Sequence, residues 1–164
     1  DVPADASLHG SMFVTAHFHY TLMGAGLTGA IAALVYWFPK MTGRMFDSRL
    51  GWIGFWFVQI GFNVAFMTMF FVGLAGQPRR VEAYASMFNL GNLITTIGAY
   101  AIMIGMLCFL AGVIYSWKNG KPAGINPWQA KSLEWTVPHP IPLENFDQLP
   151  TVTSDVYGYG KAKA

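Results

Sequence analysis

Charged residues and cysteine are both scarce in this chain of 164 residues, and each scarcity excludes a class of protein. Asp, Glu, Lys and Arg together make up 11% of the residues, about half the share that a soluble domain carries. The single cysteine, Cys108, excludes an intrachain disulfide, and a lone thiol cannot form a zinc cluster, an iron–sulfur cluster or a two-cysteine copper centre. The net charge is only +2 and no run of basic residues occurs, so we expect no nucleic-acid partner.

The composition that remains is that of an integral membrane protein, with 54% hydrophobic and 16% aromatic residues. A helix needs about 20 apolar residues to cross the hydrocarbon core of a bilayer. Three stretches reach this length, at about 12–38, 50–75 and 86–117, and we expect Pro39 to end the first of them. The sequence therefore predicts an all-α integral membrane protein whose three transmembrane helices form part of a larger helical bundle.

Polar segments flank these helices at both ends of the chain. Residues 1–11 precede the first helix, and residues 118–164 form a polar, proline-rich tail. Pro138, Pro140 and Pro142 alternate in this tail, which favours an extended segment lying on a protein surface rather than a separate domain.

Basic residues indicate the orientation in the membrane, because Lys and Arg are enriched in loops on the inner side. Residues 1–11 contain none. Basic residues gather in the loop after the first helix and at the start of the tail: Lys40, Arg44, Arg49, Lys118 and Lys121. We therefore expect the amino end on the outer side and the tail facing the cytoplasm or the mitochondrial matrix. Arg79 and Arg80 then fall on the outer side, against this rule, which suggests that a buried anionic partner holds them.

Small and polar residues in the apolar stretches predict contacts between helices. Four glycines recur every seven residues of the third stretch: Gly91, Gly98, Gly105 and Gly112. A seven-residue period drifts only about 20° per repeat on a straight helix, so we expect one stripe against which a neighbouring helix packs, with a flat ligand as the alternative. Gln59 and Asn63, one turn apart, favour hydrogen bonds between helices, and a proton or water path is the second interpretation.

Two histidines stand one residue apart in Ala16-His17-Phe18-His19-Tyr20, at the start of the first apolar stretch. Successive residues of an α-helix are rotated by about 100°, so His17 and His19 point about 200° apart and cannot bind one ion together. They suit two centres on opposite sides of one helix, and imidazole is a common axial ligand of haem iron. The alternative is that both histidines form hydrogen bonds to neighbouring helices.

A series of motifs resembles subunit I of the haem–copper terminal oxidases, specifically its carboxy-terminal three helices. In chain order the motifs are Leu8-His9, Phe13-Val14, His17-Phe18-His19-Tyr20, Trp37-Phe38-Pro39, Gly73-Leu74, Gly76, Pro78-Arg79-Arg80, Asn92 and Leu133-Glu134-Trp135. The resemblance spans nearly the whole chain, and the combination of His-Phe-His with Pro-Arg-Arg is highly specific. It implies part of the catalytic subunit of a proton-translocating respiratory oxidase that reduces O2 to water.

The resemblance also implies a role for each residue that matches a landmark. His17 matches the proximal ligand of the high-spin haem iron, and His19 matches an axial ligand of the low-spin haem iron. Phe18 matches a residue between the two haems. Arg79 and Arg80 match the pair that binds the haem propionates. A guanidinium fork suits such a role, since it can form bidentate contacts with a carboxylate.

One residue departs from the pattern of the family. His9 matches a histidine of a magnesium site, but Gly10 stands where the family usually has an acidic residue. Magnesium prefers oxygen ligands, so the loss of a carboxylate puts this metal in question. In the alternative interpretation, His9 forms a hydrogen bond to water or to a propionate.

The resemblance implies two haems, for which the a type is expected, and a copper ion in the same site whose ligands lie outside this chain. The chain has four histidines, fewer than both haems and the copper ion need. We therefore expect a fragment of a longer subunit, or one half of a subunit encoded in two pieces, that is inactive by itself. The expected partners are the remainder of subunit I, subunits II and III, the lipid bilayer, and cytochrome c or quinol as electron donor. The expected location is the bacterial or the mitochondrial inner membrane.

Two other functions fit parts of the sequence. Nitric oxide reductases also carry two histidines on one helix, although Trp-Phe-Pro and Pro-Arg-Arg favour the oxidases. A three-helix accessory or transport protein without haem is the alternative from another class. It predicts that His17 and His19 contact protein groups and that Arg79 and Arg80 have no buried anion.

Overall fold

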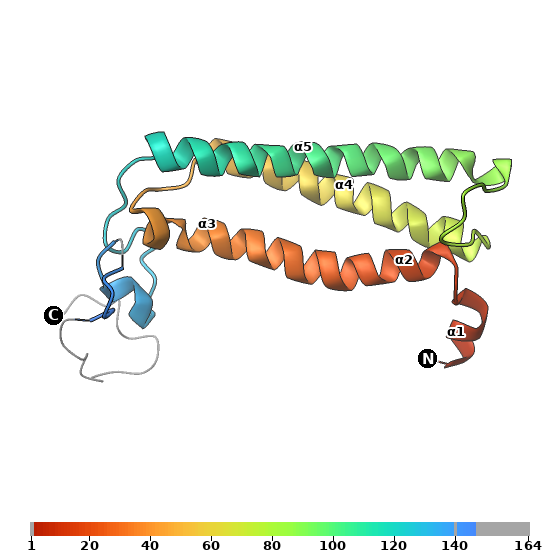
Figure 1. Ribbon diagram of the computed structural model, residues 1–164, viewed down its shortest axis with the longest axis horizontal. Helices are drawn as coiled ribbons and strands as arrows, with labels where there is room; N and C mark the ends of the chain where they lie inside the picture. Colours follow the sequence, from red (N-terminus) through yellow and green to blue (C-terminus); the bar gives the residue numbers. More distant parts are fainter. Residues whose placement is uncertain (1, 140, 147–164) are drawn as a thin grey trace. The chain divides into compact units, whose positions relative to one another are not determined.

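The chain folds into helices joined by loops in the computed structural model, which describes residues 2–139 and 141–146 (Figure 1). In chain order the elements are α1 (Val2–Leu8), α2 (Met12–Phe18), the π-helix η1 (His19–Leu27), α3 (Thr28–Thr42), α4 (Ser48–Leu74), the 3₁₀ turn η2 (Ser86–Phe88), α5 (Asn89–Asn119) and the 3₁₀ turn η3 (Leu133–Thr136). Within the described ranges, three continuous helical stretches are long and apolar enough to cross a membrane: Met12–Thr42, Ser48–Leu74 and Ser86–Asn119. The predicted all-α membrane fold is confirmed.

Two compact units divide the chain, and each is described by itself. The first comprises residues 1–32 and 48–111, and the second comprises residues 33–47 and 112–164. The candidate site residues between His9 and Arg80 all belong to the first unit.

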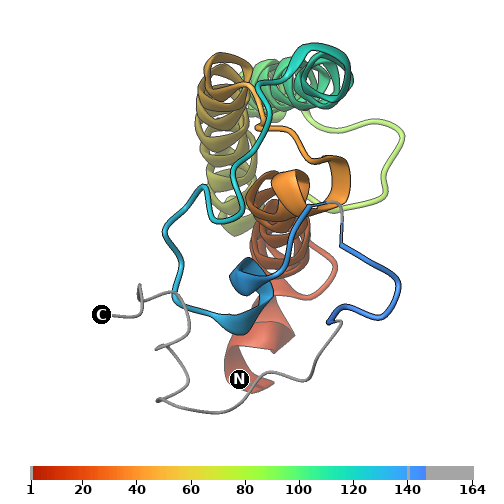
Figure 2. The same ribbon diagram turned by 90° about the vertical axis from the view of Figure 1, so that its left-hand side faces the viewer.

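In the first unit, α4 and α5 run side by side with their backbones in contact (Figures 1 and 2). A Cβ atom added to Gly61 would lie 2.7 Å from the carbonyl oxygen of Gly98, and one added to Gly54 would lie 3.1 Å from that of Gly105. A Cβ atom added to Gly91 would collide with the Val72 side chain of α4. Only hydrogen fits at such distances, so glycine permits this close approach. The predicted packing of the glycine stripe against a neighbouring helix is confirmed for the three members in this unit.

The core of the first unit lies where α4 meets α5 and the first long helix. Its buried members are Phe62, Ala65, Phe66 and Ile102, with Tyr20, Met23, Met69 and Met106 packed against them. The Tyr20 hydroxyl donates a hydrogen bond of 2.9 Å to Oδ1 of Asn63 on α4. The interhelical hydrogen bond predicted for Asn63 is therefore confirmed.

The carboxyl end of α4 turns toward the segment that precedes α2. Gly76 has a φ of +94°, a conformation that glycine adopts without strain. The N–H of Gln77 donates to the carbonyl of Val72 at 3.0 Å, and the N–H of Gly76 donates to that of Gly73 at 3.1 Å. This Schellman end satisfies two of the last carbonyls of the helix. Beyond it, the N–H of Met12 donates to the carbonyl of Gln77 at 2.9 Å, which joins the two segments.

The first long helix continues through Pro39 and ends at Thr42, so the prediction that Pro39 ends it is wrong. Proline removes one backbone hydrogen bond and crowds the carbonyl four residues earlier. Both effects fall on the turn before Pro39, so the residues after it can continue the helix. Gly43 provides the actual end, since it has a φ of +71° and its N–H donates to the Pro39 carbonyl at 2.8 Å.

In the second unit, the first part of the tail lies against the end of α3. The Lys40 ammonium donates to the carbonyl of Val137 at 2.6 Å and lies 5.0 Å from the centroid of the Trp135 ring. Trp135 is only 1% exposed. A cation over an aromatic face is attracted by the ring quadrupole, so this contact supports the packing of the tail. Pro140 and residues 147–164, which the predicted extended tail includes, lie outside the described residues.

Candidate functional site

His17 lies near the carboxyl end of α2, and its imidazole is exposed. The ring has no hydrogen-bond partner in the part of the chain that the structure describes. An open pocket of about 330 Å³ lies beside it, lined by residues of α1 and α2: Ala4, Asp5, Leu8, Phe13, Val14 and His17. The ring is thus free to bind a group from outside this chain.

His19 begins the π-helix η1, and its imidazole is half-buried. Its Nδ1 lies 2.7 Å from the carbonyl oxygen of Thr15, and its ring stacks on that of Phe66, with centroids 4.3 Å apart and planes inclined by 17°. A carbonyl oxygen only accepts hydrogen bonds, so Nδ1 carries the hydrogen and Nε2 of the neutral ring keeps its lone pair. Histidines that bind metals show this arrangement, with one nitrogen bonded to a carbonyl and the other left for the metal.

The two imidazoles meet different neighbours, as the rotation of about 200° between them predicts. His17 borders the pocket beside α1, whereas His19 contacts α4. Phe18 is 37% exposed, and its ring centroid lies 4.4 Å from that of His19. A neutral imidazole with a free nitrogen suits the axial position of a haem iron, so the residues present fit two separate haems.

The π-helix η1 is a local feature that the sequence analysis missed. It covers His19–Leu27, and the N–H of Thr28 reaches back to the carbonyl of Met23, five residues earlier. Gly24 and Gly26 weaken the preference of this segment for an α-helix. Wide turns of this kind are rare and occur frequently at functional sites. These glycines, a few residues after the histidine pair, were the feature of the sequence from which the wider turn could have been predicted.

Arg79 and Arg80 lie in the loop after α4, which pairs with the segment between α1 and α2. The N–H of Arg79 donates to the carbonyl of Gly10 at 2.8 Å, and an isolated β-bridge joins Ser11 to Pro78. Neither guanidinium forms an ion pair with a carboxylate among the described residues. Their charges are therefore available to an anion from outside this chain, such as a carboxylate.

The backbone of Arg80 is unusual, with a φ of +63°. Residues other than glycine rarely adopt this conformation, and it costs free energy that the surrounding structure must supply. Strained backbone of this kind clusters at ligand-binding sites. The side chain of Arg80 is exposed, and that of Arg79 is half-buried.

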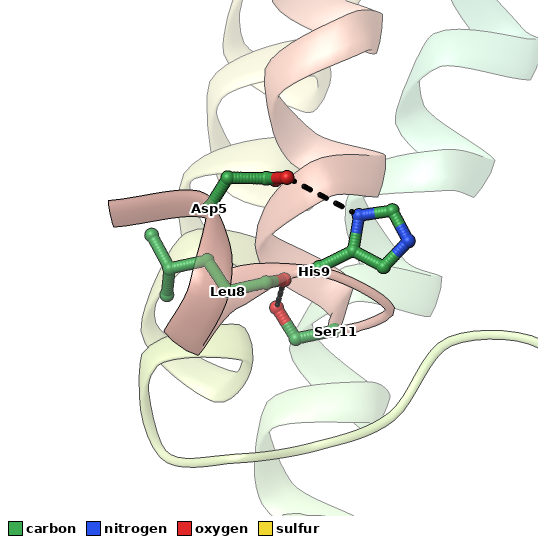
Figure 3. A network of polar contacts seen from close by, with 4 residues as sticks. All are labelled: Asp5, Leu8, His9 and Ser11. Atoms are coloured by element: carbon green, nitrogen blue, oxygen red, sulfur yellow. Dashed lines mark hydrogen bonds and ion pairs between the residues drawn. The ribbon is translucent and has the colours of Figure 1, made fainter. Parts of the chain in front are cut away.

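His9 lies next to the segment that pairs with the arginine loop, and Asp5 is the one carboxylate recorded beside it among the described residues. Its Nδ1 is 3.4 Å from Oδ2 of Asp5, one turn earlier, and these side chains are 72% and 61% exposed (Figure 3). Figure 3 also shows the Ser11 hydroxyl donating to the Leu8 carbonyl at 2.7 Å. No group of three or more His, Cys, Asp or Glu side chains that could hold a metal occurs in residues 2–139 and 141–146. Magnesium prefers several oxygen ligands, so these residues alone do not fit it.

Gly10 has a physical reason to be glycine rather than an acidic residue. Its φ is +79°, a conformation in which any side chain is strained. The carbonyl of Gly10 also accepts the hydrogen bond from Arg79. The backbone of Gly10 therefore helps to hold the loop that carries the arginines in place.

A reciprocal pair of amide side chains supports the same loop. Nε2 of Gln77 donates to Oδ1 of Asn92 at 3.1 Å, and Nδ2 of Asn92 donates to Oε1 of Gln77 at 3.1 Å. Gln77 is buried, so both of its polar atoms need partners. Asn92 is one of the residues that carry the family resemblance, whereas no feature of the sequence pointed to Gln77.

Comparisons with known proteins cover most of the chain. The family described as "Cytochrome C and Quinol oxidase polypeptide I" matches residues 1–101. Cytochrome c oxidase subunit 1 of Thermostichus vulcanus is 46% identical over 158 residues, which are 96% of this chain and 29% of that protein. The corresponding subunit of Synechocystis sp. is 39% identical over 159 residues, covering 97% of this chain and 29% of that protein. That of Alkalihalophilus pseudofirmus is 41% identical over 155 residues, covering 93% and 25%. The chain thus spans less than a third of the length of these relatives.

Proposed function

Because this chain belongs to the cytochrome c and quinol oxidase polypeptide I family, we propose that it forms part of the catalytic subunit of a proton-translocating respiratory oxidase that reduces O2 to water. The observation that carries the proposal is the pair of histidines, whose rings lie in different surroundings and each keep a nitrogen free for iron. The chain spans 29% of its relative from Thermostichus vulcanus. We assign the activity to the complete subunit I together with subunits II and III.

In this proposal, His17 binds the iron of the high-spin haem and His19 binds the iron of the low-spin haem. The two haems, of the a type, and a copper ion held by residues outside this chain supply the electron-transfer and oxygen chemistry. The Thr15 carbonyl holds the proton of His19 on Nδ1, so Nε2 is the nitrogen that binds iron. Phe18 occupies the space between the two haems.

Arg79 and Arg80 bind the haem propionates in this proposal. Their guanidinium groups have no carboxylate partner within the described ranges, and a planar fork of donors matches a carboxylate. Their positive charge favours the reduced haem, which is less positive than the oxidised form. The hydrogen bond between Arg79 and Gly10 holds this loop beside His9, which is then placed to bond to water or to a propionate rather than to magnesium.

The membrane location follows from the apolar helices, and the orientation is part of the proposal. Residues 1–11 lie on the outer side, and the helices cross within Met12–Thr42, Ser48–Leu74 and Ser86–Asn119. The tail, residues 118–164, faces the inner side, because the basic residues gather there. The relatives named above are bacterial, so we place the chain in a bacterial membrane, with cytochrome c or quinol as electron donor.

The test is an absorption spectrum of the complete oxidase carrying His17→Ala or His19→Ala. We expect His19→Ala to lose the low-spin haem band and His17→Ala to lose the high-spin haem band, because each variant removes one axial ligand. Oxygen consumption is expected to be abolished in both variants.

His139→Ala is the matched control, because this histidine lies in the tail and its Nε2 is 2.7 Å from the carbonyl of Gly124. It is expected to leave both bands unchanged. Assembled oxidase with both haem bands intact in the His17 and His19 variants contradicts the proposal and favours an accessory protein.

A further inference from the structure

We infer that Phe66 on α4 is a positioning residue that fixes the plane of the His19 imidazole and thereby tunes the low-spin haem. This inference rests on the proposed function, since it assumes that His19 binds that haem. Phe66 forms no hydrogen bond with the imidazole. Its ring stacks on the face of the imidazole instead.

Two contacts restrain the His19 ring in different ways. The hydrogen bond from Nδ1 to the Thr15 carbonyl, 2.7 Å long, holds one edge of the ring. The Phe66 ring lies against its face, with centroids 4.3 Å apart and planes inclined by 17°. The edge contact alone leaves the ring free to tilt about the line of the bond, and the stacking contact removes that freedom.

Phe66 is itself held in place, so it can restrain its neighbour. It is 7% exposed and belongs to the buried cluster with Ala65 and Ile102. The Phe62 ring meets it edge to face, with centroids 4.9 Å apart and an angle of 61°. A side chain in such surroundings keeps one rotamer because the interior is close-packed.

The next residue after His19 anchors the backbone to the same helix. The Tyr20 hydroxyl donates to Oδ1 of Asn63 at 2.9 Å, one turn of α4 before Phe66. The Tyr20 ring also meets Phe62 edge to face, at 4.8 Å. The position of His19 relative to Phe66 is therefore set by contacts on both residues.

The orientation of an axial imidazole is one of the properties by which a protein tunes a metal centre. Neighbours that fix the ring alter the electronic state of the iron without binding to it. A purely structural Phe66 would affect the stability of the fold, but it would leave the spectroscopic signature of the bound iron unchanged. This difference separates the two interpretations.

The test uses the complete oxidase with Phe66→Leu and Phe66→Met. Both replacements remove the flat ring with a similar change of volume. The flexible side chain of methionine adapts to the space left by the ring, which protects folding. The readouts are the electron paramagnetic resonance g values and the midpoint potential of the low-spin haem. We expect altered g values and a change of about threefold in the reduction equilibrium, within the range of an aromatic pair, which corresponds to about 30 mV at 59 mV per tenfold.

Phe66→Tyr and Phe71→Leu are the controls. Tyrosine keeps the ring, so it is expected to keep the g values of the parent oxidase. Phe71 lies on the same helix but is 65% exposed, so its replacement is expected to leave the low-spin haem unchanged. The high-spin haem serves as an internal control in every variant.

The outcomes separate the positioning role from the proposed function. Unchanged g values and potential in Phe66→Leu and Phe66→Met, with the low-spin band lost in His19→Ala, overturn the role of Phe66 and leave the proposed function intact. If His19→Ala keeps the low-spin band, the proposed function itself fails, and Phe66 positions no iron ligand.

Discussion

Two helix contacts within the first unit differ in the residues that dominate them. Between α4 and α5, glycines bring the backbones together, as at Gly61 and Gly98. Between α4 and the start of the first long helix, Gly73 meets the backbone of Phe13, and the other contacts include several aromatic rings and the imidazole of His19. Further aromatic contacts there join Phe13 to Phe70 and Tyr20 to both Phe62 and Phe70.

The difference shows two ways in which packing fixes a position: the distance between two helices, and the plane of a side-chain ring. Glycine backbones in contact have no side chain to rearrange, so the α4–α5 contact holds two helices at one distance. Aromatic rings present flat faces, so the other contact can hold an imidazole in one plane. The proposed iron ligand His19 lies in the aromatic contact, and the described part of α5 supplies no histidine.

Gly98→Ala is expected to have the largest effect on stability, because it breaks the glycine contact. Its Cβ would lie 2.5 Å from the backbone nitrogen of Ala65 and 2.8 Å from the carbonyl oxygen of Gly61. Backbone atoms cannot move aside cheaply, so we expect a loss of about 1–3 kcal/mol. The measurement is thermal denaturation of the purified oxidase, with the haem spectrum as the signal.

Gly29→Ala is the matched control for this variant. Nothing lies within 4 Å of a Cβ atom at Gly29, and alanine favours a helix by about 1 kcal/mol over glycine. The two substitutions are therefore expected to have opposite signs. Equal effects would show that the close backbone contact does not matter.

Phe70→Leu is expected to have an intermediate effect, because it weakens the aromatic contact. The Phe70 ring lies 4.7 Å from that of Phe13 and 5.6 Å from that of Tyr20. We expect a loss of about 0.5–1.5 kcal/mol for the aromatic pairing, measured by the same denaturation. The adjacent Phe71→Leu should change little, since Phe71 is 65% exposed; a loss as large as that of Phe70→Leu would argue against this account.

The hydrogen bond between Tyr20 and Asn63 is expected to contribute least. Double-mutant cycles of interhelical hydrogen bonds in membranes average about 0.6 kcal/mol. The cycle consists of Tyr20→Phe, Asn63→Leu and the double variant, each followed by thermal denaturation. We expect a favourable coupling near this value. A coupling of zero would mean that the aromatic rings alone hold His19 beside α4.

Much of the fold was predictable from the order of the residues. Long apolar stretches must form helices in a bilayer, since every backbone polar group needs an internal partner there. The stripe of Gly91, Gly98 and Gly105 predicted a helix contact because its seven-residue period keeps one face of a helix. Pro39 misled the prediction, because proline disturbs the turn before it but allows the helix to continue after it, as far as Gly43.

The candidate site was predictable only in part. The spacing of His17 and His19 predicted two different surroundings, and the structure agrees. The π-helix after His19 was not predictable, because the choice between an α-turn and a wider turn depends on small differences in free energy. Gly10 was recognised as a departure, but its φ of +79° explains it only once the backbone is seen.

Three properties could be predicted from the order of residues alone: a membrane-spanning helical chain, the separation of two histidines around one helix, and a family. The first two follow from composition and from helical periodicity, which act locally along the chain, and the family follows from the resemblance of motifs such as His-Phe-His and Pro-Arg-Arg. The stacking of Phe66 on His19 and the hydrogen bond between Gly10 and Arg79 became visible only in the folded chain. In each case the partners are 47 or more residues apart, so their contact depends on how helices pack and loops pair, and no local rule specifies it.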